Sequence, residues 1–163
     1  MKKLIPIITI SCFLFLSACA QNNTNIKSIA AYFTISIPGM QRVDENGNKI
    51  NPQAIVTRFL YVETKGKSKP FFDTISYNGS LFSYSIILDS NTLKVGVNKE
   101  GVPINMKAIK GNAIWKVDLQ PLNDRQKNIP VNANNIILKG KTDKIVFKIN
   151  LKNEIELSTP DMY

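Results

Sequence analysis

Apolar and polar residues alternate with a period of two along most of the chain after residue 27. Successive side chains of a β-strand point to opposite faces, so this period predicts strands with one face buried. Beyond the first 18 residues, no window of about a dozen residues shows the 3.6-residue period of an amphipathic helix. We therefore predict an all-β protein. The clearest strand-like stretches are residues 28–37, 54–64, 71–77, 81–89, 113–120 and 144–151.

Turn-forming residues separate these stretches. Asn78-Gly79 between two alternating runs is the strongest short signal for a β-hairpin. Residues 54–64 are apolar on both faces, which is typical of a central strand covered on both sides. We predict about nine short strands in a single domain of residues 28–163, arranged as an antiparallel β-sandwich of immunoglobulin-like or transthyretin-like layout. A small β-barrel is the alternative, and in either fold Trp115 lies in the core.

The first 19 residues have a different pattern. Lys2 and Lys3 precede an apolar run over residues 4–16, and the small residues Ser17 and Ala18 follow it. A basic start, an apolar middle and small residues before a cleavage point are typical of a secretory signal. The run is shorter than the ~20 apolar residues that a membrane-spanning helix needs. The sequence therefore predicts export.

The four residues Leu16-Ser17-Ala18-Cys19 resemble the lipobox of bacterial lipoproteins. The resemblance implies that residues 1–18 are removed and that Cys19 carries diacylglycerol and an amide-linked acyl chain such as palmitate. Residues 19–27 are then the lipidated cysteine and a polar tether. Ala20 in place of an aspartate favours the outer membrane if the cell has two membranes. The alternative is an ordinary secretory signal with an incidental cysteine.

The net positive charge of the chain bears on which kind of partner it can bind. The sequence holds 21 basic and 12 acidic residues, and the chain without residues 1–18 keeps a net formal charge of +7. We expect no nucleic-acid partner, because the lysines are spread over predicted turns and outer faces and an exported chain meets little nucleic acid. Attraction to anionic lipid head groups or acidic surface polymers fits the location better. Solvated lysines also keep sheet edges from pairing with other chains.

Residue types exclude much of enzyme chemistry. The sequence has no histidine. The lipobox resemblance also implies that Cys12 lies in the removed segment and that Cys19 is acylated, which leaves no free cysteine in the mature domain. Ser-His-Asp and Cys-His catalysis and the usual His/Cys metal sites are therefore excluded. Glu154 and Glu156 are two residues apart, so we expect both on one exposed face of a strand, where they form no catalytic cleft. We predict no catalytic residue and no cofactor.

A metal site is also not expected. Asp44, Asn46 and Asn48 have the spacing that begins a calcium loop. However, Lys49 stands where such a loop needs glycine, and no glutamate closes the loop. The pattern is that of a turn.

Aromatic residues are the remaining candidates for binding. We predict an interaction surface formed by Phe71, Phe72, Tyr32 and Tyr77, whose rings could stack on a sugar or fill a partner's pocket. Ordinary core packing is the alternative for each.

The leading hypothesis is a non-catalytic module that docks a protein partner in an envelope assembly. A lipoprotein that binds glycan or another small ligand is the second hypothesis, and an enzyme using carboxylates is the third.

Overall fold

The computed structural model describes residues 24–37, 42–46, 49–50, 54–122 and 133–158, and every structural statement below concerns these residues. The predicted signal segment, Cys19 and Asn48 lie outside them. The strands are β1 (Ile26–Ser36), β2 (Arg42–Val43), β3 (Lys49–Ile50), β4 (Ile55–Lys65), β5 (Pro70–Tyr77), β6 (Ser80–Leu88), β7 (Thr92–Val97), β8 (Pro103–Lys107), β9 (Asn112–Pro121), β10 (Ile136–Thr142), β11 (Ile145–Leu151) and β12 (Ile155–Leu157).

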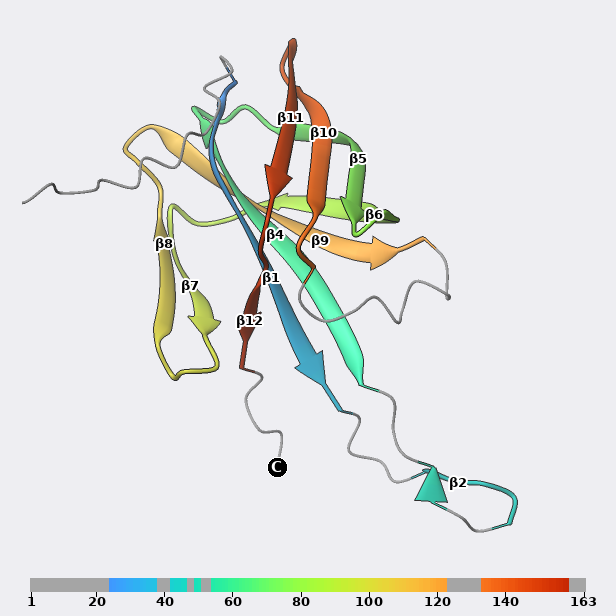
Figure 1. The fold of residues 1–163 in the computed structure, drawn as a ribbon. Coiled ribbons are helices and arrows are strands. Elements are labelled where there is room, and N and C mark those ends of the chain that lie inside the picture. The colour runs from blue at the N-terminus through green and yellow to red at the C-terminus, as the bar shows by residue number, and fades with distance from the viewer. Residues whose placement is uncertain (1–23, 38–41, 47–48, 51–53, 123–132, 159–163) are drawn as a thin grey trace, which may run out of the picture.

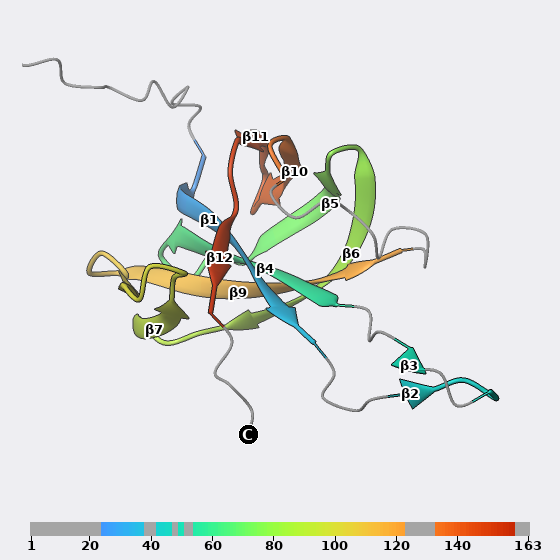
Figure 2. The same ribbon diagram turned by 60° about the horizontal axis from the view of Figure 1, so that its bottom comes forward.

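Eight of these strands form one sheet in the order β11-β10-β5-β6-β9-β4-β1-β12 (Figure 1). All pairs within it are antiparallel except β1–β12, which is parallel and matches Tyr32 with Ile155. The end strands β11 and β12 are consecutive in the chain, and the sheet curls so that β10 and β11 lie across from β1 and β4 (Figure 2). The all-β prediction is confirmed, and the arrangement is consistent with a sandwich or a half-barrel.

The predicted hairpin and central strand are both present. Tyr77 pairs with Ser80, so Asn78-Gly79 forms the two-residue connection, and both residues have the left-handed φ of 48° and 86° that such a turn requires. Strand β4 lies between β1 and β9 and is buried without interruption from Arg58 to Thr64. Strand β1 begins at Ile26, so the domain starts two residues before the predicted boundary.

The core has two parts because β4 is covered on both faces. On one face the curled sheet encloses a cluster that includes Leu60, Val62 and Trp115, and the Trp115 Nε1–H donates to Thr64 Oγ1 at 3.0 Å. Trp115 is therefore in the core, as predicted. On the other face the β7–β8 pair, which lies to the left of β12 in Figure 1, covers a second cluster. Its buried members are Tyr32, Phe59, Tyr61, Ala108, Ile114 and Leu157.

Candidate functional site

Three of the four aromatic residues predicted to form an interaction surface are buried. Tyr32 is 3% exposed, Phe72 is 4% exposed and Tyr77 is fully buried. Each ring packs against another aromatic ring in the core, so none can contact a partner in the folded protein. The prediction was wrong for these three. Phe71 points to the opposite face of β5 from Phe72 and is 50% exposed.

Glu154 and Glu156 do not share an exposed face, so that prediction was also wrong. Glu154 lies in the connection between β11 and β12, where the strand alternation does not apply, and its side chain is buried. Glu156 is on β12 and forms an ion pair with Lys99 at 2.7 Å, with the lysine side chain 67% exposed. The two carboxylates therefore have different environments despite their spacing.

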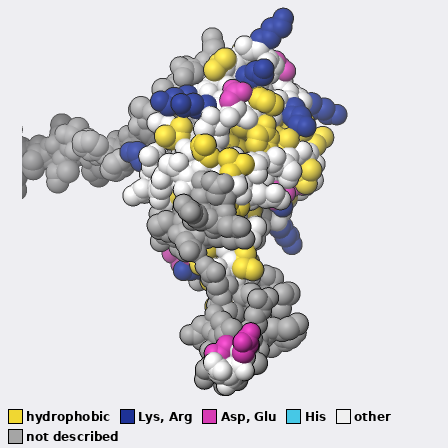
Figure 3. Space-filling view, turned by 90° about the vertical axis from the view of Figure 1, so that its right-hand side faces the viewer, with side chains coloured by type: hydrophobic (Ala, Val, Ile, Leu, Met, Phe, Trp, Pro, Cys, Tyr) yellow, Lys and Arg dark blue, Asp and Glu magenta, His cyan; other side chains and the backbone are white. Residues whose placement is uncertain are grey.

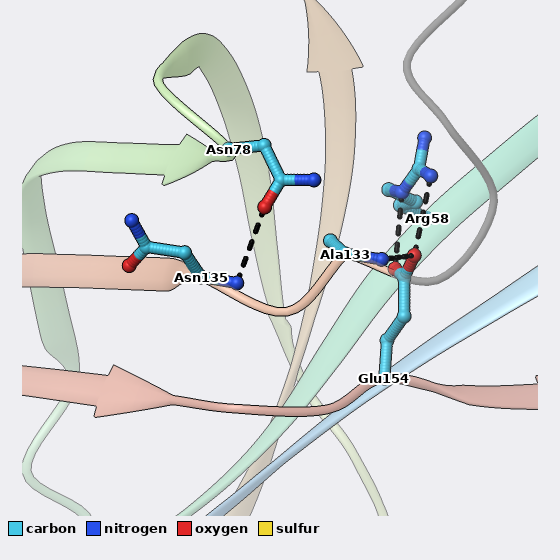
Figure 4. Close-up of polar contacts among 5 residues, drawn as sticks. All are labelled: Arg58, Asn78, Ala133, Asn135 and Glu154. Atoms are coloured by element: carbon cyan, nitrogen blue, oxygen red, sulfur yellow. Dashed lines mark hydrogen bonds and ion pairs between the residues drawn. The ribbon is translucent and has the colours of Figure 1, made fainter.

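Glu154 accepts hydrogen bonds from two other parts of the fold (Figure 4). Arg58 of β4 approaches its carboxylate with two nitrogens, Nε at 3.0 Å from Oε2 and Nη2 at 3.2 Å from Oε1. The backbone N–H of Ala133, which precedes β10, donates to Oε1 at 3.0 Å. The Arg58 and Glu154 side chains are only 3% and 0% exposed. This buried cluster ties the β11–β12 link to β4 and to the start of β10, so we assign it a structural role.

A second polar contact fixes the same region. The Asn78 side chain at the β5–β6 turn accepts a hydrogen bond from the Asn135 N–H at 3.2 Å (Figure 4). In return, the Asn78 N–H donates to the Asn135 carbonyl at 2.8 Å. The β5–β6 turn is thus held against the residues that lead into β10.

Glu63 is the second buried carboxylate among the described residues, and its contacts are also structural. Its Oε1 accepts from the Ile109 N–H at 2.9 Å and from Asn112 Nδ2 at 2.6 Å, and its Oε2 accepts from Ser28 Oγ at 3.3 Å. Burial alone would raise the pKa of Glu63, but these hydrogen bonds and the charge of Lys27 together hold it below the ordinary value of 4.5. In its ionised form, Glu63 therefore holds the β8–β9 connection against β4 and β1.

The lowered pKa of Glu63 predicts a pH dependence of stability. The folded state binds the Glu63 proton less readily than the unfolded state, so the stabilisation is present above pH 4.5 and is lost as the pH falls through the folded pKa. We expect Glu63→Gln to lose less stability than the wild type when the pH is lowered from 6 to about 3. Urea unfolding of both chains at each pH measures the difference. Equal losses in the two chains would contradict the assignment.

The carboxylates do not combine into a metal centre. Within the described ranges, no three Asp, Glu, Cys or His residues are grouped closely enough to hold a metal ion. In the 42–46 segment, Asp44 Oδ1 accepts from the Asn46 N–H at 2.9 Å, as expected for a turn. Asn48, the third residue of the calcium-like pattern, lies outside the described residues.

One end of the domain gathers lysines from distant parts of the sequence. There the Lys65 N–H donates to the Asn25 carbonyl at 2.7 Å, and Asn25 Nδ2 donates to Asp143 Oδ2 at 2.9 Å. These contacts and the β-bridge between Gly66 and Asn112 bring together the segments 24–27, 65–70, 109–112 and 141–145, which we call the basic end. Its lysines, all exposed, are Lys27, Lys65, Lys67, Lys69, Lys110, Lys141 and Lys144.

The basic end carries little negative charge to balance these lysines. Asp143 is the only acidic residue of its four segments. An open depression of about 530 Å³ lies among them, lined by Lys65, Lys110 and neighbouring polar residues. Figure 3 shows dark blue side chains at the upper end of the molecule, with a few acidic side chains among them, and further dark blue side chains lower down. Sequence reasoning missed this surface, because the lysines are scattered along the chain and only the fold gathers them.

Comparisons with known proteins give no relative for this chain. No family model, curated protein or solved structure matches it. Among the described residues there is also no helix with the length and apolar character needed to cross a membrane.

Proposed function

We propose that this protein is a bacterial lipoprotein, held in the cell envelope by acyl chains on Cys19, whose β-domain is a non-catalytic module that binds a protein partner. One observation carries the anchoring proposal: the lipobox-like residues Leu16-Ser17-Ala18-Cys19 directly follow a short apolar run with a basic start. Two or more acyl chains give a stable membrane attachment, whereas one does not. If the cell has two membranes, Ala20 favours the outer one.

The side-chain contacts of the domain favour a binding role over a catalytic one. The buried carboxylates of Glu63 and Glu154 have their oxygens engaged by hydrogen-bond donors that link strands and connections. A carboxylate held in this way is a poor general acid or nucleophile, since its lone pairs already face donors. Glycan binding has little support, because three of the four candidate stacking rings are in the core.

Strand β6 supports a protein partner. Over residues 83–88 it pairs with β9 on one side, whereas its pairing with β5 involves only residues 80–82. The side chains of Ile87 and Leu88 in this part are 55% and 52% exposed. A strand with one unpaired edge and exposed apolar residues can accept a further strand from another protein.

Cys19→Ala tests the anchor. We expect the variant to lose the acylated mature N-terminus and its stable attachment to membranes, because the thiol that receives the lipid is gone. Mass spectrometry of the N-terminal peptide and membrane fractionation measure both effects. Cys12→Ala is the matched control, since Cys12 lies within the predicted signal and should leave acylation unchanged. An acylated N-terminus in the Cys19→Ala chain would refute the lipoprotein assignment.

Affinity purification of the wild-type protein with a tag at its C-terminus tests the partner. After mild crosslinking in cells, the wild-type protein purified from membranes should carry one or two envelope proteins in stoichiometric amount. Purification of the tagged protein alone would count against the docking role and favour a search for a small ligand.

A further inference from the structure

We propose that the basic end of the domain lies flat on the bilayer to which Cys19 is attached, with its lysines against the phosphate groups of anionic lipids. The inference rests on the proposed lipid anchor and adds an orientation and a specific surface to it. The partner is the lipid surface itself. Three features of the described residues support this orientation: where the chain enters the fold, how charge is distributed, and which apolar side chains are exposed.

Chain length brings the basic end to the membrane. Asn25, which hydrogen bonds to Lys65 and Asp143, is six residues after Cys19. Six residues span at most about 20 Å even when fully extended. An anchored Cys19 therefore keeps the basic end within about 20 Å of the bilayer surface. The length of the link sets no such limit on the opposite end of the domain.

Charge distribution favours an anionic surface at this end. Lys67, Lys69 and Lys110 are exposed and form no ion pair within the described part of the chain. Elsewhere Lys99 pairs with Glu156 and Lys116 pairs with Asp118, although other exposed lysines such as Lys94 form no ion pair among the described residues. The basic end differs in that Asp143 is the single acidic residue of its segments. Each lysine close to an anionic membrane changes the partition toward it by roughly five-fold, within a Debye length of the surface.

Exposed apolar side chains stand among these lysines. Ile109 is 65% exposed and directly precedes Lys110, and its backbone is fixed by the hydrogen bond to Glu63. Phe71 is 50% exposed, and the Lys141 ammonium lies 5.3 Å from the centre of its ring. Val146, which pairs with Lys141, is 74% exposed. Apolar side chains flanked by lysines suit the boundary between head groups and acyl chains, where ammonium groups reach phosphates while apolar parts enter the bilayer.

The test uses the processed, acylated protein purified from membranes in detergent and added to preformed vesicles. One set of vesicles is phosphatidylcholine alone, and the other contains about one third phosphatidylglycerol. A membrane-impermeant amine reagent labels exposed lysines, and mass spectrometry gives the labelling rate at each position. In anionic vesicles we expect labelling of Lys67, Lys69 and Lys110 to slow by about ten-fold or more relative to neutral vesicles. Lys94 and Lys152, which lie outside the basic end, should be unaffected.

Two triple variants sharpen the test. Lys67→Gln/Lys69→Gln/Lys110→Gln should clearly reduce the slowing at Lys144, one of the four lysines that remain, because three of the seven positive charges of the basic end are gone. Lys94→Gln/Lys99→Gln/Lys152→Gln removes the same charge from exposed lysines elsewhere and should keep the slowing. Salt at about 1 M, where the Debye length is about 3 Å, should remove the slowing in the wild type.

The outcomes separate this inference from the anchor. Flotation of the protein with neutral vesicles depends on the acyl chains alone. A protein that does not float with these vesicles would overturn the lipoprotein proposal and this inference with it. Flotation together with equal labelling in both vesicle types would overturn the docked orientation and leave the anchor standing. Slowing caused only by an added acidic polymer, and not by anionic vesicles, would also overturn the assignment to the lipid surface.

Discussion

Glu154→Ala is expected to destabilise the fold by about 3–5 kcal/mol, because it leaves the Arg58 guanidinium buried without the carboxylate that balances its charge. The same change removes the acceptor of the Ala133 N–H, which is a further cost for a buried donor. The cluster links the β11–β12 connection to β4, so its loss should also loosen the closure of the curled sheet. Urea unfolding at neutral pH measures the change in the free energy of unfolding.

Glu156→Ala is the matched control two residues away. Its partner Lys99 is largely exposed, and an ion pair of this kind contributes about 1 kcal/mol or less. We therefore expect a difference of at least about 2 kcal/mol between the two variants. Similar stabilities would show that the Arg58–Glu154 contact does not hold the sheet together.

Gly140→Ala is expected to cost at least about 3 kcal/mol or to prevent folding, because β10 passes too close to β5 for a side chain at this position. A Cβ atom on Gly140 would overlap the backbone carbonyl oxygen of Phe71 and would lie 2.9 Å from both Phe147 Cζ and Phe72 Cα. The register between β10 and β5 is irregular at this point, between Lys139 and Gly140. Two of the three obstacles are backbone atoms, which cannot move aside as a side chain can.

Gly101→Ala is the control for the loss of a glycine without a clash. Gly101 has a left-handed φ of 79°, and nothing lies within 4 Å of the position of an added Cβ. Only the backbone penalty of about 1–2 kcal/mol is expected there. Thermal unfolding of both variants compares them, and a Gly140→Ala chain as stable as Gly101→Ala would contradict the close approach.

The strands could be predicted because their signals are local. Alternation along 113–120 corresponds to β9 and alternation along 144–151 corresponds to β11. Strand β11 has one face against the core, whereas β9 is buried on both faces at Ala113, Ile114 and Trp115. The turn at Asn78-Gly79 depends on the φ preferences of two residues and needs no tertiary information. The short β2–β3 pair flanks the predicted turn at Asp44 and Asn46 and could not be predicted itself, because strands of two residues are too short to show a period.

The candidate binding residues could not be predicted in the same way. Alternation shows that Phe71 and Phe72 face opposite sides, but it does not show which side is covered. Tyr32 and Tyr77 read equally well as surface or core residues, since a tyrosine ring can pack in a core or contact a partner. The curl of the sheet and the β7–β8 pair decide which of these rings are buried.

By itself, the sequence determined the all-β class, the main strands, the hairpin turn and the exclusion of histidine chemistry, because these follow from local periodicity and residue type. Only the tertiary structure decided that the sheet curls, that Glu154 is buried against Arg58, and that lysines from four segments share one end. These features depend on contacts between residues far apart in the chain. Spacing along the sequence carries no information about such contacts until the strands have been paired.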